Sequence, residues 1–157
     1  MPHHNHPGLG ELLRYVGELV ERGAENHYKQ MGLNYRARFT PVLRALQSGL
    51  QTVTEITAHS HLTQGAVSQT VAQMEAEGLI VRQRQDDGRK SLIVLTEHGR
   101  SLVETLGAHW AATFAVIESL EHDIGHPLRR VLEDAATALE RQDFGARLTQ
   151  IKQEQAS

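Results

Sequence analysis

Between residues 52 and 78 the sequence encodes two short helices, and the signals that start and stop them constrain the fold more than any other feature. The letters "TVTE" form a capping box, in which Thr52 starts a helix and Glu55 reaches back toward the first turn. Thr63 is placed to cap a second helix and Gly78 to stop it. Only a short turn separates the two helices. This arrangement predicts a helix-turn-helix, whose second helix enters the major groove of DNA.

A hairpin is expected directly after the second helix. Residues 79–84 and 89–95 are rich in Leu, Ile and Val, and Asp87-Gly88 lies between them. Asp87 and Gly88 are assigned a structural role, because glycine tolerates the positive φ that a two-residue hairpin turn needs. Four cationic side chains flank this turn: Arg82, Arg84, Arg89 and Lys90. The hairpin is therefore predicted to be a basic wing that contacts DNA phosphates or enters the minor groove.

The outer face of the second helix is predicted to read DNA bases. When Val67, Val71 and Met74 face the core, at about 100° per residue, no charged side chain remains opposite them. The residues expected to contact DNA from this helix and its cap are Thr63, Gln64, Gly65, Ser68, Gln69 and Gln73. Glutamine can pair with adenine, and serine can bind a base or a phosphate. Phosphate contacts then fall to the wing, with Arg36 and Arg38 of "NYRAR" as further candidates.

Helical patterns flank this unit on both sides. Residues 9–30 carry one apolar stripe, and the segment after Asn34 is expected to be helical with an irregularity near Thr40, because Pro41 cannot sit inside a regular helix. A long helix is expected to begin at Thr96 and a last helix at Pro127. The final residues are polar and are expected to fray.

The fold class predicted from these elements is mainly α-helical with a small β-hairpin wing. Residues 1–157 form a single domain, in which 34–96 make the winged helix-turn-helix and 1–33 and 97–150 are dimerisation helices. The chain has a net charge of −3, yet residues 34–100 carry more basic than acidic side chains. A basic middle region on an acidic chain is consistent with contact to double-stranded DNA. The terminal apolar stripes exceed what a winged helix needs to cover itself, which predicts a homodimer.

Composition excludes several other classes of protein. The chain has no cysteine, so it has no disulfide, no thiolate zinc site and no thiol redox switch. No apolar run approaches the ~20 residues that span a membrane, and we expect a cytoplasmic protein without a membrane partner. No nucleophile–base pair or phosphate-binding loop is visible. We therefore expect no enzymatic activity and no cofactor.

Ten histidines raise the question of a metal, but their positions do not predict a site. Gly125 and Pro127 interrupt the helix that would align His122 with His126, and the histidines before residue 7 precede the first helix. We therefore expect no bound metal. Two alternatives stay open beside a ligand-responsive regulator: a metal-responsive regulator that uses His109 and its neighbours, and a winged-helix interaction module that does not bind DNA.

The stretch from Thr52 to Gly99 resembles the DNA-binding lobe of MarR-type transcriptional regulators. Asp87-x-Arg89, an apolar strand and Leu95-Thr96-x-x-Gly99 stand at the spacing of that family, and "AVSQTVAQMEAEGLI" fits its recognition helix. Two positions depart from the family pattern: His61 stands where glycine is frequent, and Gln69 where arginine is common.

The resemblance implies a homodimer that binds a palindromic operator, in most cases as a repressor. It also implies a small-molecule effector held near the dimer helices, for which Tyr35, Phe39 and Trp110 are the candidate residues. Aromatic residues at helical spacing are more often core or interface residues, so these three side chains also have a purely structural interpretation.

Overall fold

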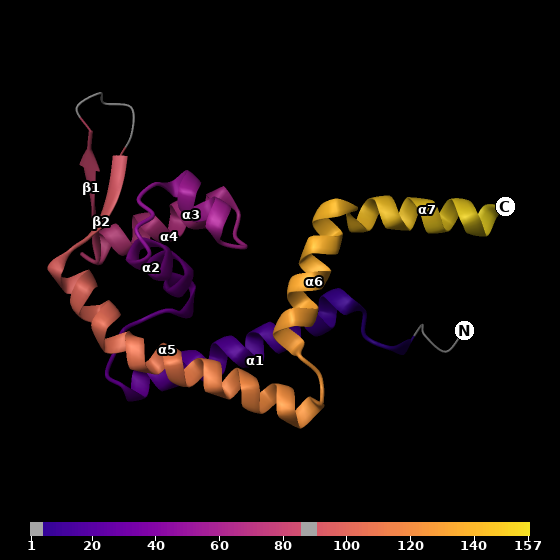
Figure 1. Ribbon diagram of the computed structural model, residues 1–157, viewed down its shortest axis with the longest axis horizontal. Coiled ribbons are helices and arrows are strands. Elements are labelled where there is room, and N and C mark those ends of the chain that lie inside the picture. Colours follow the sequence, from indigo (N-terminus) through magenta and orange to yellow (C-terminus); the bar gives the residue numbers. More distant parts are fainter. Residues whose placement is uncertain (1–4, 86–90) are drawn as a thin grey trace. The chain divides into compact units, whose positions relative to one another are not determined.

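A computed structural model describes residues 5–85 and 91–157 of the chain (Figure 1). The elements in chain order are α1 (Leu9–Gln30), η2 (Ala37–Phe39), α2 (Thr40–Gln47), α3 (Val53–His59), α4 (Gln64–Ala76), β1 (Ile80–Arg84), β2 (Ser91–Leu95), α5 (Glu97–Ile124), α6 (Leu128–Arg141) and α7 (Phe144–Ala156). Two compact units divide the chain, Met1–Glu104 and Thr105–Ser157, and the boundary falls within α5. Among the described residues, no helix combines the length and the apolar content that crossing a membrane requires.

The helix-turn-helix is α3 and α4, and both predicted caps are confirmed. The N–H of Glu55 donates to Thr52 Oγ1 at 3.1 Å, and the N–H of Ala66 donates to Thr63 Oγ1 at the same distance. The Glu55 carboxylate accepts from the N–H of Gln51 at 2.9 Å, one residue earlier than a capping box would place it. Side chains therefore satisfy backbone donors at the start of each helix.

The core of the first unit lies among α2, α3, α4 and the hairpin. We call the segment from η2 to β2 the lobe. Its fully buried side chains come from every one of these elements: Phe39, Val42, Leu43, Ile56, Val67, Val71, Met74, Ile80 and Ile93. Burial of these apolar side chains is the main term that holds the lobe together.

The expected helix directly after Asn34 is wrong, because residues 33–36 are not helical; the irregularity expected near Thr40 is a change of helix type. Residues Ala37–Phe39 form a 3-10 turn, and α2 begins at Thr40 with Pro41 in its first turn. Proline is tolerated at this position, because the first N–H groups of a helix have no partner within the helix. The chain thereby turns from the loop after α1 into the lobe.

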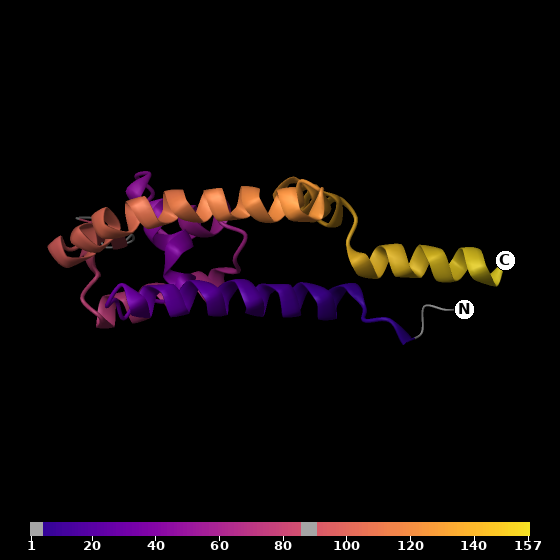
Figure 2. The ribbon, with the colours of Figure 1, turned by 90° about the horizontal axis from the view of Figure 1, so that it is seen from below.

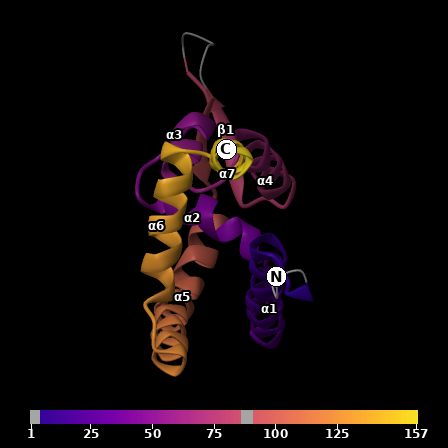
Figure 3. The same cartoon turned by 90° about the vertical axis from the view of Figure 1, so that its right-hand side faces the viewer.

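The strands β1 and β2 pair in antiparallel register from Ile80 opposite Leu95 to Arg84 opposite Ser91. The hairpin leaves the helical part of the unit beside α4 (Figures 1 and 3). The predicted turn residues Asp87 and Gly88, and the predicted phosphate contacts Arg89 and Lys90, lie outside the described residues.

The helix α1 is confirmed from Leu9 to Gln30, and Gly32 follows it with a φ of 74° that favours glycine. Three residues of its apolar stripe, Leu12, Leu13 and Leu19, are exposed among the described residues. Such a face is unusual in a helix of a monomeric protein.

The expected single last helix with a fraying tail is wrong, because the structure has two helices there (Figure 2). The first, α6, ends at Arg141, and Asp143 caps α7 by accepting from the N–H of Ala146 at 2.7 Å. The Arg147 guanidinium holds the turn between them, since it donates to the carbonyls of Ala138 and Gln142, both at 2.9 Å. The tail is polar in composition but helical to Ala156.

Candidate nucleic-acid interface

The helix α4 is held in the lobe by one apolar face. Val67, Val71 and Met74 are fully buried, as the helical spacing predicted. Thr70 is also buried on this side, which the sequence did not indicate because threonine is common on surfaces. At its end Gly78 adopts a φ of 76° and stops the helix.

The opposite face of α4 is exposed and uncharged. Gln64, Gly65, Gln69 and Ala72 are exposed, and Ser68 is partly exposed between them. Gln73, at the margin, donates from its amide to the Glu77 carboxylate at 3.5 Å, so its amide is already engaged. The face therefore combines amide and hydroxyl groups, which can donate and accept hydrogen bonds, with positions that carry little or no side chain.

The N-terminal end of α4 is open to an anion. Thr63 is exposed, and its hydroxyl accepts from Ala66 while its own proton remains available for donation. No acidic residue stands in the first turn of the helix. The partial positive charge of the helix N-terminus is therefore not offset by a carboxylate there.

The register of the hairpin assigns the wing residues to faces. Arg82 lies on the same sheet face as Ile80 and Ile93, both buried, because alternate residues of a strand share a face. From this face the Arg82 guanidinium reaches α4, where its Nε lies 3.6 Å from a carboxylate oxygen of Glu75. Glu75 is the only charged residue of α4. Arg82 thus offsets the one negative charge on the helix, a role that the sequence pattern did not indicate.

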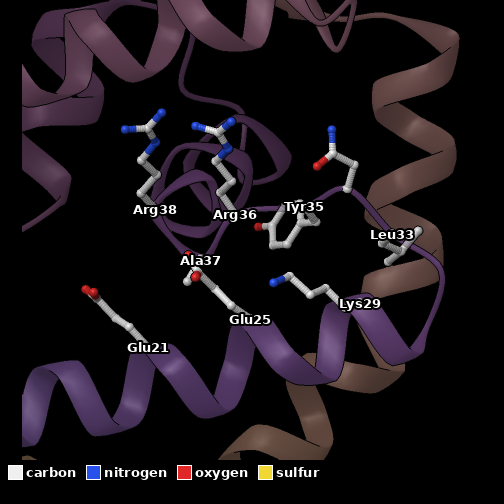
Figure 4. A pocket seen from close by; sticks show the side chains of 9 residues that line it. Glu21, Glu25, Lys29, Leu33, Tyr35, Arg36, Ala37 and Arg38 are labelled. Atoms are coloured by element: carbon white, nitrogen blue, oxygen red, sulfur yellow. The ribbon is translucent and has the colours of Figure 1, made fainter.

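The remaining predicted cations are exposed where the structure describes them. Arg84 ends β1 on the surface. Arg36 and Arg38 lie at the start of η2 beside a cavity of about 550 Å³, and both are exposed. Figure 4 shows their guanidinium groups extending away from α1, whose Glu21 and Glu25 line the same cavity. The Arg38 guanidinium also lies 5.9 Å from the centre of the Phe39 ring.

The Tyr35 ring is buried among aromatic neighbours. Its ring centre lies 4.6 Å from that of Tyr28 and 5.8 Å from that of Phe39, both in edge-to-face geometry. The Tyr35 hydroxyl shares a 2.7 Å hydrogen bond with the Thr40 hydroxyl. Burial raises the pKa of Tyr35 above its ordinary value, because the ionised ring would lose its hydration.

The three residues proposed to bind an effector, Tyr35, Phe39 and Trp110, differ in their burial and in whether they line a cavity. Tyr35 lines the cavity of about 550 Å³ and a second one of about 390 Å³, whereas Phe39 is fully buried in the lobe. Trp110 belongs to the second unit and is partly buried, and its indole N–H meets no hydrogen-bond acceptor among the described residues. Residues 5–85 and 91–157 bring no three histidine, aspartate or glutamate side chains together in a metal-binding arrangement.

The Leu-Thr-x-x-Gly pattern has a structural explanation at the end of α4. The Thr96 hydroxyl donates to the carbonyl of Gly78 at 2.6 Å and accepts from the N–H of Gly99 at 3.0 Å. A Cβ on Gly99 would collide with the carbonyl oxygen of Leu79. Thr96 therefore caps α5 and also joins its start to the end of α4. Only glycine fits at position 99, because the backbone of Leu79 lies too close for a Cβ.

Comparisons with known proteins point to one family. Residues 40–91 match the model of the MarR family. A MarR-family transcriptional regulator from Rhodococcus sp. RHA1 is 27% identical, with 82% of this chain and 91% of that chain covered and a TM-score of 0.58. The regulator MosR of Mycobacterium tuberculosis, solved in complex with DNA, is 18% identical, with 86% and 98% covered and a TM-score of 0.71.

A third similar structure also contains DNA. The Staphylococcus aureus MepR–DNA complex is 20% identical to this chain, with 85% of this chain and 99% of that chain covered and a TM-score of 0.68. No curated protein matches the sequence. The matches with DNA are below 25% identity, and they establish the fold that this chain shares with DNA-binding regulators.

Proposed function

Because the chain has the winged helix-turn-helix fold of MarR-family transcriptional regulators and matches that family's model over residues 40–91, we propose that it is a homodimeric, sequence-specific DNA-binding regulator. In this proposal the regulator represses transcription, and a small-molecule effector relieves the repression. The observation that carries the proposal is the outer face of α4, which is exposed, uncharged and able to donate and accept hydrogen bonds.

Two groups of residues are assigned different tasks at the DNA. Ser68 and Gln69, with Gln64 and Gly65, face the base edges of the major groove, while Thr63 at the helix N-terminus receives a phosphate. The cations bind phosphates without reading sequence: Arg36, Arg38, Arg84, Arg89 and Lys90, together with Arg82, whose Nε also lies 3.6 Å from the Glu75 carboxylate. This division is supported by the absence of any cation in α4.

The homodimer is supported by the exposed apolar residues of the terminal helices. Leu12 and Leu19 on α1, Leu132 on α6 and Leu148 on α7 all stay exposed in the single chain. Two lobes related by a twofold axis would place their α4 helices about 34 Å apart, one turn of DNA. The operator is accordingly an imperfect palindrome, and a footprint of one unpaired half-site would contradict the dimer geometry.

Salt dependence of DNA binding tests the proposed division of tasks. Arg84→Ala is expected to weaken binding to all duplexes and to lower the slope of log K against log salt by about 0.9, the value for one lost phosphate contact. Arg141→Ala, which removes an exposed cation from α6, is the matched control and should leave affinity and slope unchanged. A chain that binds no duplex even at low salt would overturn the proposed function.

The effector is proposed to be an apolar or aromatic small molecule that binds beside Tyr35. Tyr35 lines two cavities, and Phe39 supports its ring from the core of the lobe. An effector can release DNA only if it binds the DNA-incompetent state more tightly than the competent one. Compounds that raise the melting temperature should therefore also lower operator affinity, with Trp110 fluorescence as the reporter. If no stabilising compound alters DNA affinity, the protein binds DNA constitutively.

A further inference from the structure

The uncharged face of α4 restricts which base pair this protein can select. Glu75 is the only charged residue between Gln64 and Ala76, and Arg82 lies 3.6 Å from its carboxylate. Recognition of guanine in the major groove is best made by two donors, because guanine presents two acceptors, O6 and N7. No side chain of α4 offers two donors on a cation. Selection of guanine by this helix is therefore disfavoured.

Glutamine offers the complementary pattern. Its amide presents one donor and one acceptor side by side, and adenine presents the N7 acceptor beside the N6 donor. The helix carries three glutamines: Gln64, Gln69 and Gln73. Gln73 is partly buried and engaged with Glu77, and Gln64 stands at the first helical residue. Gln69 is exposed, and its side chain forms no hydrogen bond to any described residue.

The neighbours of Gln69 leave its amide room to reach a base. On a helix surface the adjacent positions are three and four residues away, and side chains lean toward the N-terminus. Gln69 therefore leans over Gly65 and Ala66, and Ala72 lies on its other side. A Cβ built on Gly65 would meet no atom within 4 Å, so packing within the described residues does not require glycine at this position. The surface around Gln69 is open to a close partner.

We infer that Gln69 selects an adenine–thymine base pair in each half-site through a two-point hydrogen bond between its amide and the adenine N6 and N7. The inference rests on the proposed function, because it names the base chemistry of that same DNA interface. Bidentate side chain–base pairs discriminate between bases by about 5-fold to about 150-fold in affinity. The arginines of the wing do not supply this preference, because phosphate contacts carry no sequence information.

The test is a selection of bound duplexes from a randomised library by the full chain and by three variants. For the wild type we expect adenine enriched at one position of each half-site. Gln69→Ala should lose the preference at that position alone, and Gln69→Arg should change it to guanine. Gln153→Ala, which removes an exposed glutamine from α7, should reproduce the wild-type profile. Thermal melting of Gln69→Ala should stay unchanged, because the side chain is exposed.

Binding of two synthetic duplexes gives the same test as an affinity ratio. The wild type should prefer the selected duplex over one with that pair changed to guanine–cytosine by about 5-fold or more, and Gln69→Ala should reduce the ratio to about 1. An unchanged profile in Gln69→Ala, or a loss spread evenly over all positions, would overturn the role of Gln69 while leaving the regulator intact. A chain that retains no duplex from the library at low salt would instead overturn the proposed function itself.

Discussion

The lobe and the terminal helices differ in how far their apolar side chains are buried. Phe39, Leu43 and Ile56 of the lobe are fully buried by their own chain, whereas Leu12 and Leu19 of α1 each expose 47% of their surface. Neither α6 nor α7 contains a buried residue. Burial of apolar surface is the main favourable term in folding, so the lobe has its own source of stability, whereas we propose that the terminal helices bury their apolar residues against a second copy.

This contrast links stability to function. A lobe that is complete by itself leaves a surface free for the DNA that we propose it binds, and exposed apolar faces of a protein mark sites of association. If the terminal helices join two copies, as we propose, the free energy of association positions the two α4 helices for a palindrome. Changes in the two regions should therefore differ in how their effects depend on protein concentration.

The largest effect is expected from charges placed on the apolar face of α1. Leu12→Glu combined with Leu19→Glu should abolish the dimer, because each unpaired charge buried in an interface costs about 3–5 kcal/mol. Sedimentation at micromolar concentration should then show monomers, and palindrome binding should be lost. Glu11→Gln with Glu18→Gln, on the same helix, should stay dimeric. A double glutamate variant that sediments as a dimer would remove α1 from the interface.

A pair of phenylalanines sharpens the comparison. Phe39 is fully buried in the lobe and Phe144 on α7 is 64% exposed. Phe39→Ala should lower the free energy of unfolding by about 3–5 kcal/mol at every protein concentration, because it leaves a cavity. Phe144→Ala should cost less, and its cost should appear only as a change in the concentration dependence of urea unfolding. If both variants lost the same free energy of unfolding at every protein concentration, both phenylalanines would belong to a core formed within one chain.

Local signals in the sequence predicted most of the lobe correctly. Thr52 and Thr63 cap the two short helices, and Val67, Val71 and Met74 form the buried face of α4. These features depend on residues three or four apart, so composition and spacing are enough to reveal them. The assignments of bases and phosphates to particular side chains remain predictions.

Features that depend on distant residues were not predictable in the same way. The pairing of Arg82 with Glu75 follows from the packing of β1 on α4, and the bond from Thr96 to the Gly78 carbonyl joins residues 18 positions apart. The break before α7 was different, because Asp143 is a local cap signal. The helix α7 was not predicted because the polar residues near the end of the chain resemble a frayed tail. Polar side chains are nevertheless compatible with an exposed helix.

Two glycines of the first unit, Gly99 and Gly65, allow a similar comparison with smaller effects on stability. Gly99 is in close contact with the backbone, and Gly65 is not. Gly99→Ala should destabilise the protein by about 1–3 kcal/mol, because its Cβ would collide with the Leu79 carbonyl oxygen. Gly65→Ala meets open space and should stabilise the protein by up to about 1 kcal/mol, since alanine is the better helix former.

DNA affinity should change in the opposite sense to stability at Gly65. The added methyl group lies on the surface proposed to approach the bases, so Gly65→Ala should weaken binding despite its higher melting temperature. Both quantities can be measured on the same samples by thermal melting and duplex titration. A Gly65→Ala variant that binds every duplex as the wild type does would show that DNA does not approach this turn.

The prediction for Tyr35 of the first unit depends on pH. Burial holds the pKa of Tyr35 above the value of about 10 that it has in the unfolded chain. Its contribution to stability is fully present below about pH 10 and is lost as the pH rises further, because the unfolded state then releases a proton that the folded state retains. Urea unfolding between about pH 8 and about pH 11 should show this decline in the wild type.

Tyr35→Phe isolates that contribution. At neutral pH it should cost about 0.5–1.5 kcal/mol, the usual value of a hydrogen bond, because the Thr40 hydroxyl loses its partner. Above about pH 10 the difference from the wild type should shrink, since phenylalanine has no proton to release. Tyr15→Phe, at an exposed position of α1, should retain the wild-type pH dependence. A Tyr35→Phe variant whose stability falls as steeply as that of the wild type would assign the alkaline decline to other groups and leave Tyr35 with a packing role in the lobe.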